Sequence, residues 1–164
     1  MNLFSPNHLH SNINKFSNLV FSFGIVILMI GFYFAFFIAP NDYQQGIMVK
    51  IMYLHVPSAW LSLAIYSSIT IMSILYLITK TPITALIVKS LAPMGFIFTS
   101  IVLISGIFWG RPMWGVWWVW DARLTSVLLL FFIYLGLMLI YRIEDKRNNH
   151  FKIAAVYALL GFIN

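Results

Sequence analysis

The chain has 164 residues, of which 62% are hydrophobic and 9% charged, and its formal net charge is +6 at pH 7. Water-soluble domains carry roughly 25% charged residues, so we expect an integral membrane protein. The absence of cysteine excludes disulfides and thiolate metal sites, and no basic cluster indicates a nucleic-acid partner.

The first 18 residues are polar and are expected to form a loosely ordered tail, because chain termini are usually poorly ordered. His8 and His10 lie in this tail and are interpreted as solvated side chains, although a spaced pair could also bind a metal. Residues 19–38 carry no charge and are long enough, at ~1.5 Å per residue, to cross a core of ~30 Å. This run is too long for a signal-peptide core, so we expect a retained membrane anchor.

Further apolar runs predict three more spans, at 59–78, 91–109 and 124–141. Pro57 is expected to mark the start of one of them and Pro93 to lie in the first turn of the next, where a missing N–H costs least. A last apolar run, 153–164, gives roughly 18 Å of helix and is too short to cross. We therefore predict an all-α polytopic transmembrane bundle over 19–164, with four complete spans and a truncated fifth.

The distribution of lysine and arginine predicts the orientation of these spans. One side of the membrane receives Lys15, Lys80, Lys89, Arg142, Lys146, Arg147 and Lys152. The opposite side receives Lys50, Arg111 and Arg123. Because positive charge favours the inside, the tail is expected on the cytoplasmic or matrix side of a bacterial or mitochondrial inner membrane. The loop at about 109–123 then faces the periplasm or the intermembrane space.

This loop holds five of the six tryptophans, namely Trp109, Trp114, Trp117, Trp118 and Trp120. Tryptophan commonly anchors proteins at the membrane interface, but five within so short a stretch exceed what anchoring needs. If the second half of the stretch is helical, Trp114, Trp117, Trp118 and Asp121 share one face. We interpret this face as an aromatic shelf for a large, flat, mostly apolar ligand.

Arg111 and Arg123 oppose the positive-inside bias, so something should favour their positions. They could pair with Asp121 or lipid phosphate, or they could bind carboxylates of a ligand. A flat molecule with two carboxylates, such as haem, would satisfy both the shelf and the arginines. His55 is expected in a loop at the same outer surface, where it is either simply solvated or an axial ligand to haem iron. No catalytic motif is present, and we expect no enzyme activity.

The segment 114–123, Trp-Gly-Val-Trp-Trp-Val-Trp-Asp-Ala-Arg, followed by Leu-Thr-Ser, resembles the WWD signature of haem-handling membrane proteins in cytochrome c biogenesis. More narrowly, the chain is similar to the haem exporter protein C family. Shorter segments agree in order: Ala-Pro-Asn-Asp-Tyr-Gln-Gln-Gly at 39–46, Tyr-Leu-His-Val-Pro at 53–57, Ala-Pro-Met-Gly at 92–95 and Trp-Gly-Arg-Pro-Met-Trp at 109–114. The resemblance covers nearly all of the chain from the first span onward.

The resemblance implies a protein that binds haem b transiently, as cargo, at the outer face of the membrane. It implies delivery to a membrane-tethered haem chaperone, and partnership with haem-export ABC transporter subunits and a small membrane protein. His55 would then ligate iron. The porphyrin platform would comprise Trp114, Trp117, Trp118, Trp120 and Asp121, and the haem propionates would meet Arg111 and Arg123.

The family usually has six spans and a second outer histidine beyond the fifth, a region that lies past Asn164. We therefore expect an incomplete protein with reduced or lost haem handling. Two other interpretations stay open from the residues alone. One is a structural subunit of a membrane complex, in which the tryptophans only anchor the chain to lipid. The other is a quinone-binding electron carrier that uses the same aromatic shelf.

Overall fold

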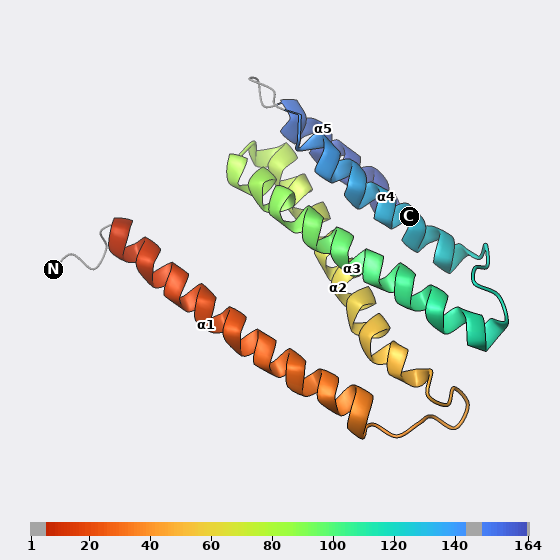
Figure 1. The fold of residues 1–164 in the computed structure, drawn as a ribbon. Coiled ribbons are helices and arrows are strands. Elements are labelled where there is room, and N and C mark those ends of the chain that lie inside the picture. The colour runs from red at the N-terminus through yellow and green to blue at the C-terminus, as the bar shows by residue number, and fades with distance from the viewer. Residues whose placement is uncertain (1–5, 144–148, 164) are drawn as a thin grey trace. The chain divides into compact units, whose positions relative to one another are not determined.

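The computed structural model describes residues 6–143 and 149–163, with side chains over 14–143 and 149–162. The described chain is helical apart from its connections (Figure 1). Its elements are α1 (Pro6–Tyr33), the π-helix η1 (Phe34–Ile38), α2 (Val49–Thr79), α3 (Pro82–Trp114), α4 (Ala122–Ile140), α5 (Asn149–Leu160) and the 3-10 helix η2 (Gly161–Ile163). Within the described residues, four helical segments are long and apolar enough to span a membrane, which confirms the predicted all-α transmembrane class.

The chain divides into two compact units, Met1–Asn41 and Asp42–Asn164. In the first unit α1 is described from Pro6 onward and continues without a break to Tyr33. The expected loose tail is therefore wrong for 6–18, which continue directly into the first span. The side chains of His8 and His10 lie outside the described residues.

In the second unit, α2 and α3 are longer than their apolar runs predicted. Pro57 lies inside α2 and Pro93 inside α3, whereas both were expected at helix starts. Another proline, Pro82, occupies the beginning of α3. Prolines are tolerated within membrane helices because neighbouring helices and local adjustments satisfy the freed backbone groups. As a consequence His55 lies within α2 rather than in a loop.

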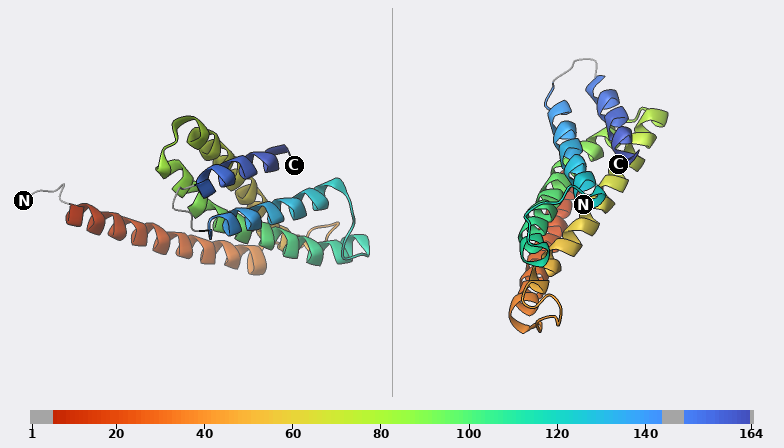
Figure 2. Two further views of the ribbon diagram at one scale, coloured as in Figure 1. Left: turned by 90° about the horizontal axis from the view of Figure 1, so that it is seen from above. Right: turned by 90° about the vertical axis from the view of Figure 1, so that its right-hand side faces the viewer.

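Because the connections between them are short, α3 runs antiparallel to α2, and α4 runs antiparallel to α3 (Figures 1 and 2). Lys80 ends α2 in the left-handed conformation, and its N–H donates to the carbonyl of Tyr76. Gly115 ends α3 in the same conformation, at φ 77°, a backbone geometry that glycine adopts readily. The start of α2, the end of α3 and the start of α4 therefore meet at one end of this unit.

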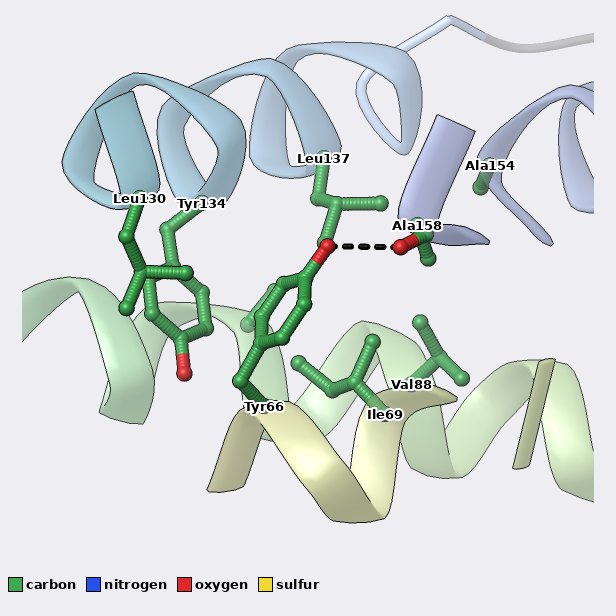
Figure 3. Close-up of a cluster of buried hydrophobic side chains, with 9 residues drawn as sticks. Tyr66, Ile69, Val88, Leu130, Tyr134, Leu137, Ala154 and Ala158 are labelled. Carbon is green, nitrogen blue, oxygen red and sulfur yellow. Dashed lines mark hydrogen bonds between the residues drawn. The ribbon is translucent and has the colours of Figure 1, made fainter. Parts of the chain in front are cut away.

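A buried cluster holds α2, α3, α4 and α5 together (Figure 3). Its two tyrosines place their hydroxyls on backbone carbonyls: Tyr66 donates to Ala158 at 2.6 Å and Tyr134 to Ser62 at 2.7 Å. The two rings pack edge to face with centroids 5.6 Å apart. Because buried hydroxyls need partners, these bonds hold α5 and α4 against α2.

Candidate ligand-binding site

A cavity of about 240 Å³ lies between α2, α3, α4 and the α3–α4 connection. It is lined by Met52, His55, Val102, Leu103, Gly106, Ile107, Trp109, Trp114, Trp118, Arg123, Leu124 and Val127. The lining is mostly apolar and aromatic, with one imidazole and one guanidinium. This composition is typical of a small-molecule site, in which apolar walls are combined with a few polar groups.

His55 is half-buried and packs against α3. Its Nδ1 lies 3.0 Å from the hydroxyl oxygen of Ser105. Gly106 provides room for the ring, because a Cβ at that position would come within 3.3 Å of His55 Cε1. The contact with Ser105 occupies Nδ1 and leaves Nε2 as the ring nitrogen available to a ligand.

The tryptophan-rich stretch does not form the helical face that its spacing suggested. Gly115 ends α3, and no helix is present from 115 to 121. Trp118 and Asp121 are thus positioned by an irregular loop, whereas Trp114 is the last residue of α3. Trp114 and Trp118 nevertheless line the cavity together with Trp109, whose ring packs edge to face on Trp114 at 5.3 Å.

Trp117 and Trp120 lie outside the cavity and are 55% and 77% exposed. Trp117 packs on Phe108, and Trp120 packs edge to face on Trp118 at 5.6 Å. The indole nitrogen of Trp118, by contrast, is buried without a hydrogen-bond partner in the described structure. A buried donor of this kind is costly to leave unpaired, and it favours a ligand that offers an acceptor.

Asp121 and the two arginines have different surroundings. Arg123 lines the cavity, forms a 2.9 Å ion pair with Asp121 and lies over the ring of Trp114. Arg111 does not line the cavity; it donates a hydrogen bond to the carbonyl of Gly115 and lies over Trp117. Of the two expected propionate partners, only Arg123 is therefore part of the cavity wall.

Asp121 is the N-cap of α4, and its Oδ1 accepts the backbone N–H of Leu124 at 2.8 Å. This hydrogen bond, and next the guanidinium of Arg123, lower the pKa of the Asp121 carboxyl. Capping at this position satisfies a backbone donor that the first turn of the helix leaves free. Asp121 therefore fixes the residue at which the loop ends and α4 begins. Its ion pair also holds Arg123 at the wall of the cavity.

Sequence reasoning missed three residues that help to build the site. Trp109 lines the cavity, and its Nε1 donates to Oε1 of Gln45 at 2.9 Å. Gln45 sits in a tight turn in which Asp42 Oδ1 accepts its N–H at 2.8 Å. Ser105 is buried beside His55. The Asp-Tyr-Gln-Gln-Gly segment was a usable signal for the turn, but an isolated serine in an apolar run gives none.

Within the described residues no three histidines, aspartates or glutamates are grouped to hold a bare metal ion. The cavity is smaller than the roughly 300–1,000 Å³ of typical ligand pockets. A large flat ligand must therefore project from it or displace part of the 115–121 loop.

A family model described as "Heme exporter protein C" matches residues 1–164. Among curated relatives, a haem exporter protein C from Bradyrhizobium diazoefficiens is 48% identical over 140 residues, which is 85% of this chain and 53% of that protein. The Escherichia coli haem exporter protein C is 43% identical over 140 residues, covering 85% of this chain and 57% of that protein. A ccmC-like mitochondrial protein of cytochrome c biosynthesis from Marchantia polymorpha is 43% identical over 150 residues, 92% of this chain and 63% of that protein. The chain thus spans little more than half the length of these relatives.

Proposed function

The chain belongs to the haem exporter protein C family, and on this premise we propose that it binds haem in the cavity between α2, α3 and α4 and presents it for c-type cytochrome assembly. The observation that carries the proposal is that His55 lines the same cavity as Trp109, Trp114 and Trp118. These residues come from separate helices and from a loop, and the antiparallel arrangement brings them to one end of the unit.

His55 is the proposed ligand to the haem iron. Histidine is the commonest protein ligand of haem, and bound haem supplies the metal together with its four equatorial nitrogens. A single imidazole is then enough, which agrees with a site that has no cluster of further ligands among the described residues. His55 binds through Nε2, because Nδ1 is held by Ser105.

The remaining cavity residues match the rest of the haem molecule. Trp109, Trp114 and Trp118 offer apolar ring surface to the porphyrin. Arg123 offers charge-assisted hydrogen bonds to a propionate, and the unpaired Nε1–H of Trp118 offers another donor. Asp121 acts indirectly, since it holds Arg123 and caps α4.

The exposed part of the loop supports a role in hand-over to a membrane-tethered haem chaperone. Trp117 and Trp120 are exposed beside the cavity-lining Trp118, and their positions suit contact with a second protein or with the bilayer interface. The relatives' names describe export of haem and biosynthesis of cytochrome c. By extension, we propose that this chain binds haem b transiently and works beside ABC transporter subunits and a small membrane partner.

The site faces the periplasm or the intermembrane space in this proposal. Lysine and arginine are in excess near the opposite ends of the helices, including Lys80, Lys89 and Arg142, and this excess favours the cytoplasmic or matrix side for those ends. Haem bound by His55 would therefore be on the side where c-type cytochromes are assembled.

The test is the visible absorption spectrum of the purified protein after haem loading. We expect His55→Gln to lose most of the Soret band that the wild-type protein shows, because glutamine keeps a polar side chain but does not ligate the iron. His150→Gln is the matched control, since His150 lies in α5 against Tyr141 and Phe151 and away from the cavity. It should keep the wild-type band.

Two results would contradict the proposal. Wild-type haem content in His55→Gln would remove His55 from the site. A folded wild-type protein that takes up no haem would favour a structural subunit, and one that instead retains a redox-active quinone would favour an electron carrier.

A further inference from the structure

We propose that Ser105 is a positioning residue that fixes the tautomer of His55, keeping the proton on Nδ1 and the lone pair of Nε2 free for a metal. This inference rests on the proposed function only for the identity of the ligand. The protonation pattern itself is a property of the ligand-free protein and can be measured there.

The hydroxyl of Ser105 carries a single hydrogen and can donate only one hydrogen bond. This hydroxyl donates to the backbone carbonyl of Ile101, and the carbonyl of Val102 lies 3.3 Å from it as a second acceptor. Both acceptors belong to the same helix, α3, and a carbonyl cannot donate. The hydroxyl hydrogen is therefore directed to the backbone, and the oxygen turns its lone pairs elsewhere.

His55 Nδ1 lies 3.0 Å from that oxygen. Two acceptors do not form a hydrogen bond with each other, so Nδ1 must carry the hydrogen. The backbone carbonyl of Val102 is a further acceptor near His55, which favours the same arrangement. In a neutral imidazole only one nitrogen is protonated, and Nε2 is left as the base.

The location of these groups makes the arrangement useful. Ser105 is buried, and Gly106 leaves space for the imidazole ring. Both residues belong to α3, so this helix determines where the ring and its Nδ1 lie. The ring lines the cavity of the proposed haem site. Metal-binding histidines generally donate their other N–H to a neighbouring acceptor, which fixes the ring and raises its basicity. Ser105 supplies this acceptor here before any ligand arrives.

The chain offers a closely matched control in Ser100. Its hydroxyl donates to the carbonyl of Phe96, in the same helix and with the same spacing along the chain as Ser105 and Ile101. Ser100 does not line the cavity. Ser100→Ala therefore removes an equivalent bond within α3 and leaves the surroundings of His55 unchanged.

The first experiment measures ¹⁵N chemical shifts of histidine side chains in the ligand-free full chain, which distinguish a protonated from a bare ring nitrogen. His55 is assigned by the signals that disappear in His55→Gln. We expect protonated Nδ1 and bare Nε2 in the wild type and in Ser100→Ala. In Ser105→Ala we expect a partial shift of the proton to Nε2, because Val102 still offers one acceptor. A wild-type His55 protonated on Nε2, or an unchanged pattern in Ser105→Ala, would overturn the inference.

The second experiment uses haem-loaded protein and resonance Raman spectroscopy of the iron–histidine bond. Ser105→Ala should lower the stretching frequency and reduce haem affinity about 10-fold, the lower end of the effect of removing such a partner. Ser100→Ala should change neither. If the wild type binds no haem, the proposed function fails, while the tautomer measurement still decides the role of Ser105. If haem binds through His55 and Ser105→Ala leaves the frequency unchanged, the role of Ser105 fails alone.

Discussion

Asp121 is the residue whose ionisation should control the shape of the tryptophan loop. Its carboxylate caps α4 through Leu124 and pairs with Arg123, and these contacts lower its pKa. The contacts therefore stabilise the loop at every pH above the ordinary aspartate value of about 3.9 and are lost as pH falls through the lowered pKa. We expect an acid titration of tryptophan fluorescence to show a transition with its midpoint below about 3.9.

Asp121→Asn tests whether the acid transition comes from this carboxyl or from another one in the chain. Asparagine is an equally good N-cap, so the start of α4 should survive, but its side chain does not titrate. The acid transition should disappear from this variant. A transition that persists unchanged would show that another carboxyl controls the loop.

Gln45 allows a second test at the scale of one hydrogen bond. Gln45→Met keeps the length of the side chain but removes the acceptor for Trp109 Nε1. We expect the free energy of unfolding in micelles to fall by about 0.5–1.5 kcal/mol, the usual contribution of such a bond. Gln44→Met is the control, because Gln44 is exposed and joins the turn through its backbone N–H. Equal stability of both variants would contradict the proposed anchoring of Trp109.

Among the helices, the packing of α4 on α3 depends on a glycine. A Cβ at Gly95 would overlap the ring of Tyr134, which is fully buried and donates to the carbonyl of Ser62. Gly95→Ala should reduce the free energy of unfolding by about 1–3 kcal/mol, as overpacking does in well-filled cores. Gly31→Ala should cause no loss of stability, because a Cβ added at this helical glycine would have no neighbouring atom within 4 Å. Wild-type stability of Gly95→Ala would mean that Tyr134 is not held as described.

The existence of the helices followed from the sequence, but their ends did not. Uncharged runs long enough to span a membrane predicted α1 to α4 correctly. Pro57 and Pro93 were wrongly placed at helix starts. A local breaker signal takes no account of neighbouring helices, which satisfy the backbone groups that a proline frees within a span. The tryptophan spacing suggested a helix, but Gly115 ends α3 through its left-handed conformation.

For the molecule as a whole, the grouping of His55 with the tryptophans was predictable from the number of spans between them. What the sequence did not reveal is which side chains meet. The contact between His55 and Ser105 joins residues that are 50 positions apart, and the bond between Gln45 and Trp109 joins residues that are 64 apart. Ser105 lies in an apolar run and carries no periodic signal, so only the packing of α2 on α3 identifies its contact with His55. Gln45 lies in the turn before α2, and only the folded chain shows that this turn reaches Trp109.

The antiparallel order of α2, α3 and α4 makes a prediction about sidedness, and the absence of cysteine makes it easy to test. Tyr43 precedes α2 and Val116 follows α3, and both residues are exposed. Thr81 lies in the α2–α3 connection at the opposite end of these helices. We expect Tyr43→Cys and Val116→Cys to react with a membrane-impermeant maleimide in intact cells. Thr81→Cys should react only after permeabilisation, because the positive-inside bias predicts that Lys80 and Lys89 lie on the cytoplasmic side. Labelling of positions 43 and 116 from opposite sides would contradict the helix order. Labelling of position 81 alone in intact cells would contradict the proposed orientation.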